Sequence, residues 1–259
     1  MINFDMLFEN KELLRTNYLT ASPFSHLTIS NICDEDKLKQ AFSQIPLLEN
    51  KSRDYMFAKN KFEKSNYGEI SPLFKELQED LRSDKMNEFL SFITAKKVFV
   101  DPMNHGGGLH QGRQNSYLDM HLDFNYHPNN SNWWREINLL LYLNKDWKEE
   151  YGGHLELLDL RTGEGKKCNV AFNTLIIQKC HDYTLHGYKP TSFPEGVFRT
   201  SIATYAFSKH IKQLYKSRTT DWFPDKEGDG VFKKYIGRNF KSLVKIKNKF
   251  LGSGTSKNQ

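Results

Sequence analysis

Seven short apolar segments follow one another between residues 96 and 207, separated by Gly, Asn, Pro and charged residues. They are 96–100, 117–123, 137–144, 154–159, 168–172, 174–178 and 197–207. Such segments are typical of strands. Because no helical pattern interrupts them, they predict an antiparallel sandwich or jelly roll. The glycine turn at 151–155 further predicts that segments 137–144 and 154–159 pair directly.

The sequence before residue 96 has mainly helical patterns. A short strand is expected at 26–31, a helix capped by Asp34 at 34–43, and a helix with Ser71 as N-cap and Pro72 at its first position. The predicted fold class is therefore mainly β with flanking helices around a jelly-roll, cupin-like core. The expected divisions are a helical bracing region 1–95, the β core 96–208, and a basic helical extension with a flexible tail 209–259.

Composition predicts a folded cytoplasmic protein. Hydrophobic residues make up 38% and aromatic residues 14%, which argues against disorder. The three cysteines are odd in number and widely spaced, as expected for reduced thiols. No apolar run approaches the roughly 20 residues that span a bilayer, and no secretory signal pattern opens the chain.

The net charge of +6 is concentrated at the C-terminal end, where residues 209–259 contain 13 Lys/Arg against 4 Asp/Glu. Within this region, 232–251 places apolar residues near helical spacing among lysines. This pattern predicts a basic amphipathic helix, and a helix packed on the core with a solvated lysine face is the favoured interpretation. Peripheral contact with the inner face of the membrane is the alternative. Nucleic acid is a less favoured partner because the sequence contains no recognisable nucleic-acid-binding module.

His121 and Asp123 are the first candidate site residues. In a regular strand, Tyr117, Asp119, His121 and Asp123 would share one face. An imidazole and a carboxylate on one face are two thirds of the 2-His-1-carboxylate set that binds non-haem Fe(II). A His-x-Asp pair alone is common, so the remaining sequence must support it.

A third ligand is expected on a strand that returns beside the first two. His181 and His186 are both candidates, and His186 is favoured because Gly187 leaves room beside a metal. Farther along, Arg199 and Ser201 share one strand face. Since a guanidinium and a hydroxyl facing inward can bind both oxygens of a carboxylate, they predict a receptor for a dicarboxylic cosubstrate.

This ordered set resembles the Fe(II)/2-oxoglutarate-dependent dioxygenases, in particular the prolyl-4-hydroxylase-like branch, from about residue 101 to 207. The resemblance implies a double-stranded β-helix, with His121, Asp123 and His186 as iron ligands. It implies that Arg199 and Ser201 bind the far carboxylate of 2-oxoglutarate. Tyr117 and Tyr142 are further candidates for cosubstrate contact, with packing in the barrel as the alternative for each. The implied reaction uses dioxygen to hydroxylate a C–H bond and releases succinate and carbon dioxide.

Substrate contacts are expected in the polar, aromatic segment that follows the metal strand. We interpret this segment as a loop. Its candidates are His127, Trp133, Trp134 and Arg135. The favoured substrate is a small molecule, an amino acid or a glycan-type biosynthetic intermediate, and prolyl residues in a peptide or protein are the alternative. Two other classes stay open: a non-catalytic cupin-like binding module, and a mononuclear metal hydrolase.

Overall fold

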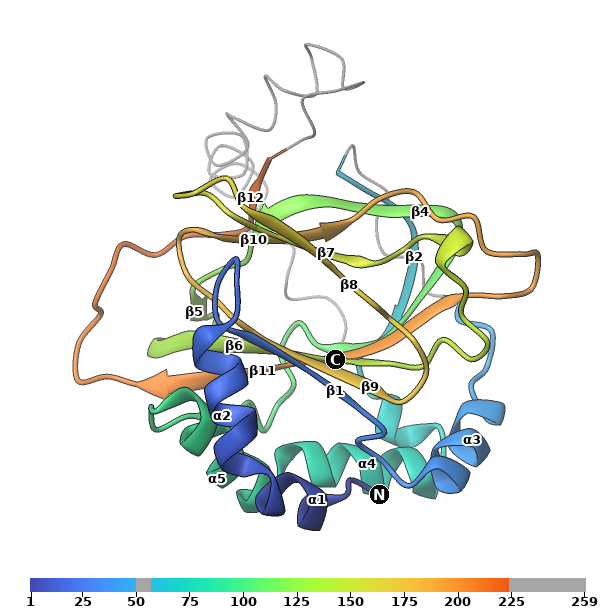
Figure 1. Ribbon diagram of the computed structural model, residues 1–259, viewed down its shortest axis with the longest axis horizontal. Helices are drawn as coiled ribbons and strands as arrows, with labels where there is room; N and C mark the ends of the chain where they lie inside the picture. The colour runs from blue at the N-terminus through green and yellow to red at the C-terminus, as the bar shows by residue number, and fades with distance from the viewer. Residues whose placement is uncertain (50–56, 224–259) are drawn as a thin grey trace.

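A single antiparallel sheet that folds over on itself forms the centre of the protein (Figure 1). The computed structural model describes residues 1–49 and 57–223. The main strand order is β1-β9-β6-β11-β4-β10-β7-β8. The bounds are β1 His26–Ser30, β4 Gly108–Leu122, β6 Asn130–Tyr142, β7 Leu155–Asp159, β8 Gly165–Cys168, β9 Thr174–Lys179, β10 Thr184–Tyr188 and β11 Arg199–Lys209.

Four shorter strands extend this sheet. β2 and β12 pair with β4, β3 pairs with β11, and β5 pairs with β6. Their bounds are β2 Ala58–Lys64, β3 Phe99–Val100, β5 Tyr126–His127 and β12 Asp221–Trp222. The predicted mainly β class with flanking helices is confirmed.

Five helices cover the layer formed by β1, β9, β6 and β11, while β4, β10, β7 and β8 lie over the other side (Figure 1). The helices are α1 Phe4–Glu9, α2 Lys11–Thr20, α3 Glu35–Ser43, α4 Pro72–Arg82 and α5 Asp84–Thr94, and the short 3₁₀ turns are η1 Tyr67–Glu69 and η2 Glu149–Tyr151. As predicted, the Asp34 and Ser71 side chains cap α3 and α4.

Strand alternation divides the core in two. On β6, Ile137, Leu139 and Leu141 join the cluster packed against the helices. Tyr142 instead joins the smaller cluster inside the roll. Because successive side chains point to opposite faces, one strand both supports the helices and supplies polar groups, such as Asn138, to the interior.

Several sequence predictions about the elements are wrong. Segments 137–144 and 154–159 do not pair, because β6 lies between β9 and β11 whereas β7 lies between β10 and β8. Residues 168–172 form no continuous strand: β8 ends at Cys168. The segment 127–135, predicted as a loop, instead includes part of β5 and the first part of β6, a hairpin whose turn lies between His127 and Asn130.

The predicted division at residue 95 stays a prediction. Most of the helices do precede it, but β1 and β2 also lie on its N-terminal side and pair with β9 and β4. The predicted amphipathic helix at 232–251, and with it the proposed membrane contact, lies outside the described residues.

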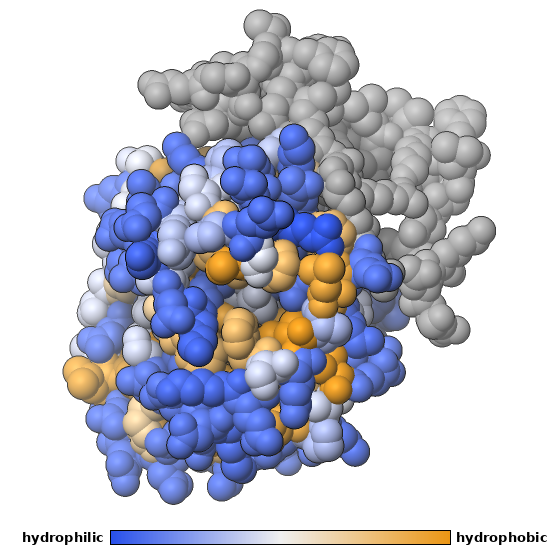
Figure 2. All heavy atoms as spheres, turned by 90° about the vertical axis from the view of Figure 1, so that its right-hand side faces the viewer, coloured by the Kyte–Doolittle hydropathy of each residue, from blue (hydrophilic) through white to orange (hydrophobic). Residues whose placement is uncertain are grey.

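None of the helices in the described ranges is long and apolar enough to cross a membrane. On the face seen in Figure 2, hydrophilic side chains predominate and hydrophobic ones gather toward the middle.

Candidate metal centre

Three potential metal ligands meet where β4 and β10 lie side by side. His186 on β10 is the register partner of His121 on β4, and Asp123 follows β4 directly. His121 Nε2 lies 3.6 Å from Asp123 Oδ1, and His186 Nε2 lies 3.6 Å from Asp123 Oδ2. One ligand atom from each of the three lies within 4.8 Å of the others. The structure therefore brings together the three residues that the sequence singled out.

Local hydrogen bonds prepare these groups for a metal ion. His121 Nδ1 lies 2.8 Å from the carbonyl oxygen of Asp119. Since a carbonyl only accepts, Nδ1 carries a proton, and Nε2 is the nitrogen on the side of Asp123 that can bind a metal. Burial lowers the pKa of His186 to about 3, so that ring is neutral. Two imidazoles and one carboxylate fit Fe(II).

Arg135 and Asn138 on β6 hold the Asp123 carboxylate. Arg135 Nη2 donates to Asp123 Oδ2 at 3.0 Å, and Asn138 Nδ2 donates to the same oxygen at 2.8 Å. Burial opposes ionisation of Asp123, but the Arg135 guanidinium holds its pKa well below the usual range. Both anchors bind Oδ2, which leaves Oδ1 facing His121.

Gly187 allows the two ligand strands to approach closely. A Cβ at this position would lie 2.6 Å from the carbonyl oxygen of Leu118 and 2.9 Å from Asp119. The sequence prediction that a glycine is needed beside His186 therefore has a physical basis, although the atoms it makes room for belong to the β4 backbone.

Arg199 lies buried at the start of β11, and its Nε donates to the carbonyl oxygen of Gly153 at 2.7 Å. Its Nη2 donates to the Tyr142 hydroxyl at 3.4 Å, and its guanidinium carbon lies 3.9 Å from the centre of the Tyr188 ring. Gly153 has a φ of +71°, and an added Cβ would lie 3.0 Å from Arg199 Cδ. All these partners are neutral, so the positive charge of Arg199 is available for an anionic ligand.

Ser201 lies between two other candidate groups. It is the register partner of Tyr142 on β6 and of His110 on β4. Neither His110 nor Lys61 was predicted from the sequence. Lys61 on β2 and Arg199 on β11 are both register partners of Gly112 on β4. Burial and the positive charges of Lys61 and Arg199 hold the pKa of His110 well below the usual range. This cluster of Arg199, Ser201, Tyr142, His110 and Lys61 fits a dicarboxylate.

Tyr117 does not share a face with His121. His186 pairs with His121, but Tyr188, two residues on, pairs with Leu118 rather than Asp119. A bulge thus inserts one residue into β4 and shifts the alternation. The prediction of a common face was wrong, and the expected cosubstrate contact of Tyr117 loses its geometric basis.

The four residues of the β5–β6 hairpin have different surroundings. His127 is buried, and its Nε2 lies 3.3 Å from Asp101 Oδ2. Its ring contacts Trp133 and Phe207. Trp134 and Arg135, by contrast, line a pocket beside the metal ligands. Substrate contact by Trp134 and Arg135 stays a prediction, and His127 does not line this pocket.

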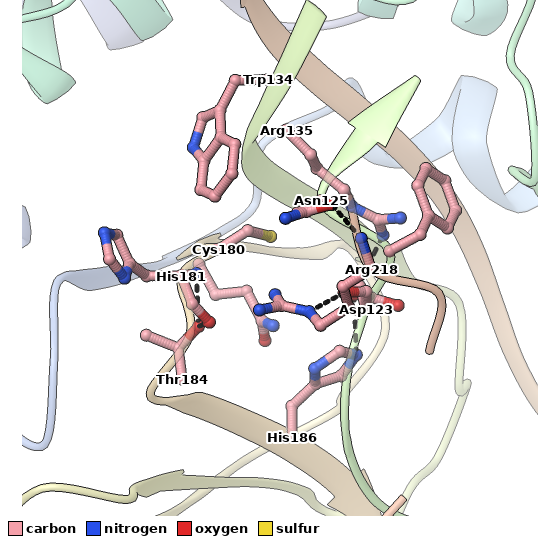
Figure 3. Close-up of a pocket in the computed structure, with 11 residues that line it drawn as sticks. Asp123, Asn125, Trp134, Arg135, Cys180, His181, Thr184, His186 and Arg218 are labelled. Atoms are coloured by element: carbon pink, nitrogen blue, oxygen red, sulfur yellow. Dashed lines mark hydrogen bonds and ion pairs between the residues drawn. The ribbon is translucent and has the colours of Figure 1, made fainter. Parts of the chain in front are cut away.

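The pocket shares Asp123 and His186 with the metal centre (Figure 3). Its other lining residues come from the segment after β4, β6, β9, the turn before β10, the start of β10 and the segment after β11: Phe124, Asn125, Trp134, Arg135, Gln178, Cys180, His181, Thr184 and Arg218. His181, the rejected third ligand, accepts a hydrogen bond from the Asp182 amide through Nδ1 and stays outside the metal cluster.

A segment that we call the strap, residues 214–223, closes one side of the site. Arg218 Nε donates to the Asp123 carbonyl oxygen at 3.0 Å, and Arg218 also forms an ion pair with Asp182. At its far end the strap pairs with β4, and the Trp222 ring lies 4.9 Å from the His121 ring. The strap therefore lies against two of the metal ligands, His121 and Asp123.

Comparison with protein families agrees with this geometry. Residues 107–207 match the model of the 2OG-Fe(II) oxygenase superfamily. The matched segment contains the three candidate ligands and Arg199. Fe(II) and 2-oxoglutarate are therefore its implied cofactor and cosubstrate. Comparison with curated proteins found no match.

Solved structures with the same fold include a prolyl hydroxylase from Trichoplax adhaerens in complex with a peptide fragment of hypoxia inducible factor. It has a TM-score of 0.57 and 16% identity over 78% of this chain and 92% of its own. A prolyl-4-hydroxylase from Pseudomonas putida has a TM-score of 0.52 and 12% identity, and the match covers 78% of this chain and 100% of that protein. The epimerase SnoN, in complex with Fe³⁺, α-ketoglutarate and nogalamycin RO, has a TM-score of 0.53 and 11% identity. This match covers 86% of this chain and 92% of SnoN. The double-stranded β-helix fold is thereby confirmed.

Proposed function

We propose that this oxygenase hydroxylates a C–H bond of a small polar molecule or biosynthetic intermediate, with His121, Asp123 and His186 as its iron ligands. The observation that carries the proposal is the convergence of these three side chains beside a pocket lined mainly by polar side chains. Such a lining suits the reacting end of a small polar substrate. Hydroxylation of prolyl residues is the other outcome of the test.

The residues around the metal centre divide the tasks of the reaction. When bound, Fe(II) together with 2-oxoglutarate and dioxygen supplies the oxidising chemistry that converts C–H to C–OH, with release of succinate and carbon dioxide. Arg199 binds the distal carboxylate of 2-oxoglutarate through its Nη atoms, aided by Ser201 and Tyr142. Arg135 and Asn138 keep Asp123 ionised and oriented. The strap limits access of water to the ligands.

The first test is an anaerobic titration of the Fe(II)-loaded protein with 2-oxoglutarate, followed by the weak visible charge-transfer band of the chelated metal. Wild type should form the band and His186→Ala should lose it. His181→Ala is the matched control, since His181 lies five residues away in the same pocket but outside the metal cluster, and should retain the band. Absence of the band in wild type would refute the proposal.

The substrate class is then tested by succinate release in air. Amino acids, sugars and small amides should stimulate succinate formation above the uncoupled rate, with a matching hydroxylated product by mass spectrometry. If only proline-containing peptides stimulate turnover, the small-molecule proposal is wrong and the prolyl hydroxylase alternative holds.

A further inference from the structure

Gln178 is a buried amide with no partner. It lies on β9, is 1% exposed, and lines the pocket beside Asp123 and His186. Neither its Oε1 nor its Nε2 has a hydrogen-bond partner among the described residues. An unsatisfied buried amide is destabilising, and most such groups in proteins are paired. A ligand that supplies the missing bonds would explain why a polar residue is placed here.

Strand alternation aims Gln178 into the roll. On β9, Leu175 and Ile177 join the core on the helix side, whereas Ile176 joins the interior cluster. Gln178 lies two residues after Ile176, so its side chain points to the same interior face, and it is the register partner of Asn138 on β6. Its amide thus shares the interior with the residue that anchors Asp123.

Several other polar groups of the pocket are already engaged. Cys180 Sγ donates to Asn138 Oδ1 at 3.1 Å, and Thr184 Oγ1 is bonded to the His181 backbone. Arg135 binds Asp123 and Asn138, and only its Nη1 has no hydrogen-bond partner among the described residues. Among the buried side-chain atoms of its lining, the pocket therefore offers a donor and an acceptor from Gln178 and one further donor from Arg135.

The charges favour a neutral occupant. The positive charge of Arg135 is matched by Asp123 3.0 Å away, and Arg218 is paired with Asp182. A carboxylate in this pocket would bring a second negative charge near Asp123, whereas a carboxamide matches both atoms of Gln178 without added charge.

We propose that Gln178 determines substrate specificity by forming paired hydrogen bonds with a carboxamide group of the substrate, next to the metal centre. This assignment rests on the proposed function, since it makes the pocket the substrate site of the oxygenase. It narrows the substrate class to small molecules that carry a neutral amide.

Binding of propionamide to the metal-free protein, followed by NMR of the side-chain amides, tests the assignment. The Gln178 amide signal is identified as the one missing from Gln178→Met, which keeps the length and shape of the side chain. Propionamide should shift this signal and bind at least about tenfold more tightly than 2-butanone, which has the same shape but no N–H donor. Propionate, which is charged, should bind more weakly than propionamide.

Gln178→Met should abolish the preference for propionamide, and Gln178→Leu provides a second variant in case the first folds poorly. Gln40→Met, an exposed position on α3, is the matched control and should bind like wild type. Equal affinities for propionamide and 2-butanone, or an unchanged preference in Gln178→Met, would mean that only water satisfies the amide and would overturn the proposal.

The charge-transfer titration separates this outcome from failure of the proposed function. If the 2-oxoglutarate band forms but propionamide does not bind, the specificity assignment fails alone. If propionamide binds but the band never forms, the oxygenase proposal fails, and the role of Gln178 in substrate choice fails with it.

Discussion

Replacement of Arg135 by methionine tests whether this side chain is the internal counter-ion of Asp123. Arg135 is 1% exposed and donates to Asp123 at 3.0 Å and to Asn138 at 2.9 and 2.6 Å. Its guanidinium also lies 3.5 Å from the Tyr205 ring centre. Although burial disfavours its charge, the Asp123 carboxylate and Tyr205 raise the pKa of Arg135. The change leaves a buried carboxylate without its cation.

Breaking a buried ion pair by removing one partner costs about 3–5 kcal/mol, and loss of the cation–π contact adds to this. Methionine retains part of the packing, so we expect the free energy of unfolding of the metal-free protein to fall by about 4 kcal/mol. A bound divalent cation would replace the missing positive charge beside Asp123. Addition of Mn²⁺ should therefore raise the melting temperature of Arg135→Met more than that of wild type.

Urea unfolding of the metal-free protein measures the first effect. Lys75→Met is the matched control, because Lys75 also pairs with a carboxylate, 3.9 Å from Glu79, but the two side chains are 70% and 67% exposed. It should lose much less stability, since solvent screens an exposed pair. A loss in Arg135→Met of less than about 1 kcal/mol would refute the counter-ion assignment.

Three further predictions follow from the site and its supports. Arg199→Ala removes two charge-assisted hydrogen bonds and should weaken 2-oxoglutarate binding about a hundredfold to a thousandfold in calorimetric titration, and an unchanged affinity would exclude Arg199 as the receptor. Gly187→Ala places a Cβ 2.6 Å from the Leu118 carbonyl oxygen and should lower both the melting temperature and the affinity for Mn²⁺, whereas wild-type values for both would show that β10 and β4 separate without cost. The hydrogen bond from Arg161 lowers the pKa of Asp159, so its contribution to stability is present above the ordinary carboxyl pKa and is lost as pH falls through the lowered value; Asp159→Asn should flatten the urea stability profile between about pH 5 and pH 2, and an unchanged slope would contradict this.

The sequence predicted the second half of β6, from Ile137 onward, because that pattern is carried by its own residues. Ile137, Leu139 and Leu141 are apolar, and they pack on the helices as a buried strand requires. β2 shows the opposite case. Among its seven residues only Ala58 and Phe62 are buried, and the rest are mostly charged. Its strand form depends on pairing with β4, which no local pattern reveals.

The same reason explains which site residues were found. His121, Asp123 and His186 belong to short motifs with a fixed order, and the structure brings them together. Lys61 and His110 come near Arg199 only because β2, β4 and β11 lie side by side, so pairing and not spacing places them. Tyr117 was assigned to the wrong face because a bulge cannot be recognised from alternation alone.

The two buried arginines of the roll show why residue type alone could not assign their tasks. Arg135 has a carboxylate partner in Asp123, so its charge is used to hold a metal ligand. Arg199 has only neutral partners, Gly153 and Tyr142, and forms no ion pair with any described carboxylate. A buried cation without a counter-ion is costly, and an anionic ligand removes that cost. We therefore propose that Arg199, which lacks an internal counter-ion, binds the cosubstrate. Arg135 already has a counter-ion, so it is proposed to offer the substrate a hydrogen-bond donor without net charge.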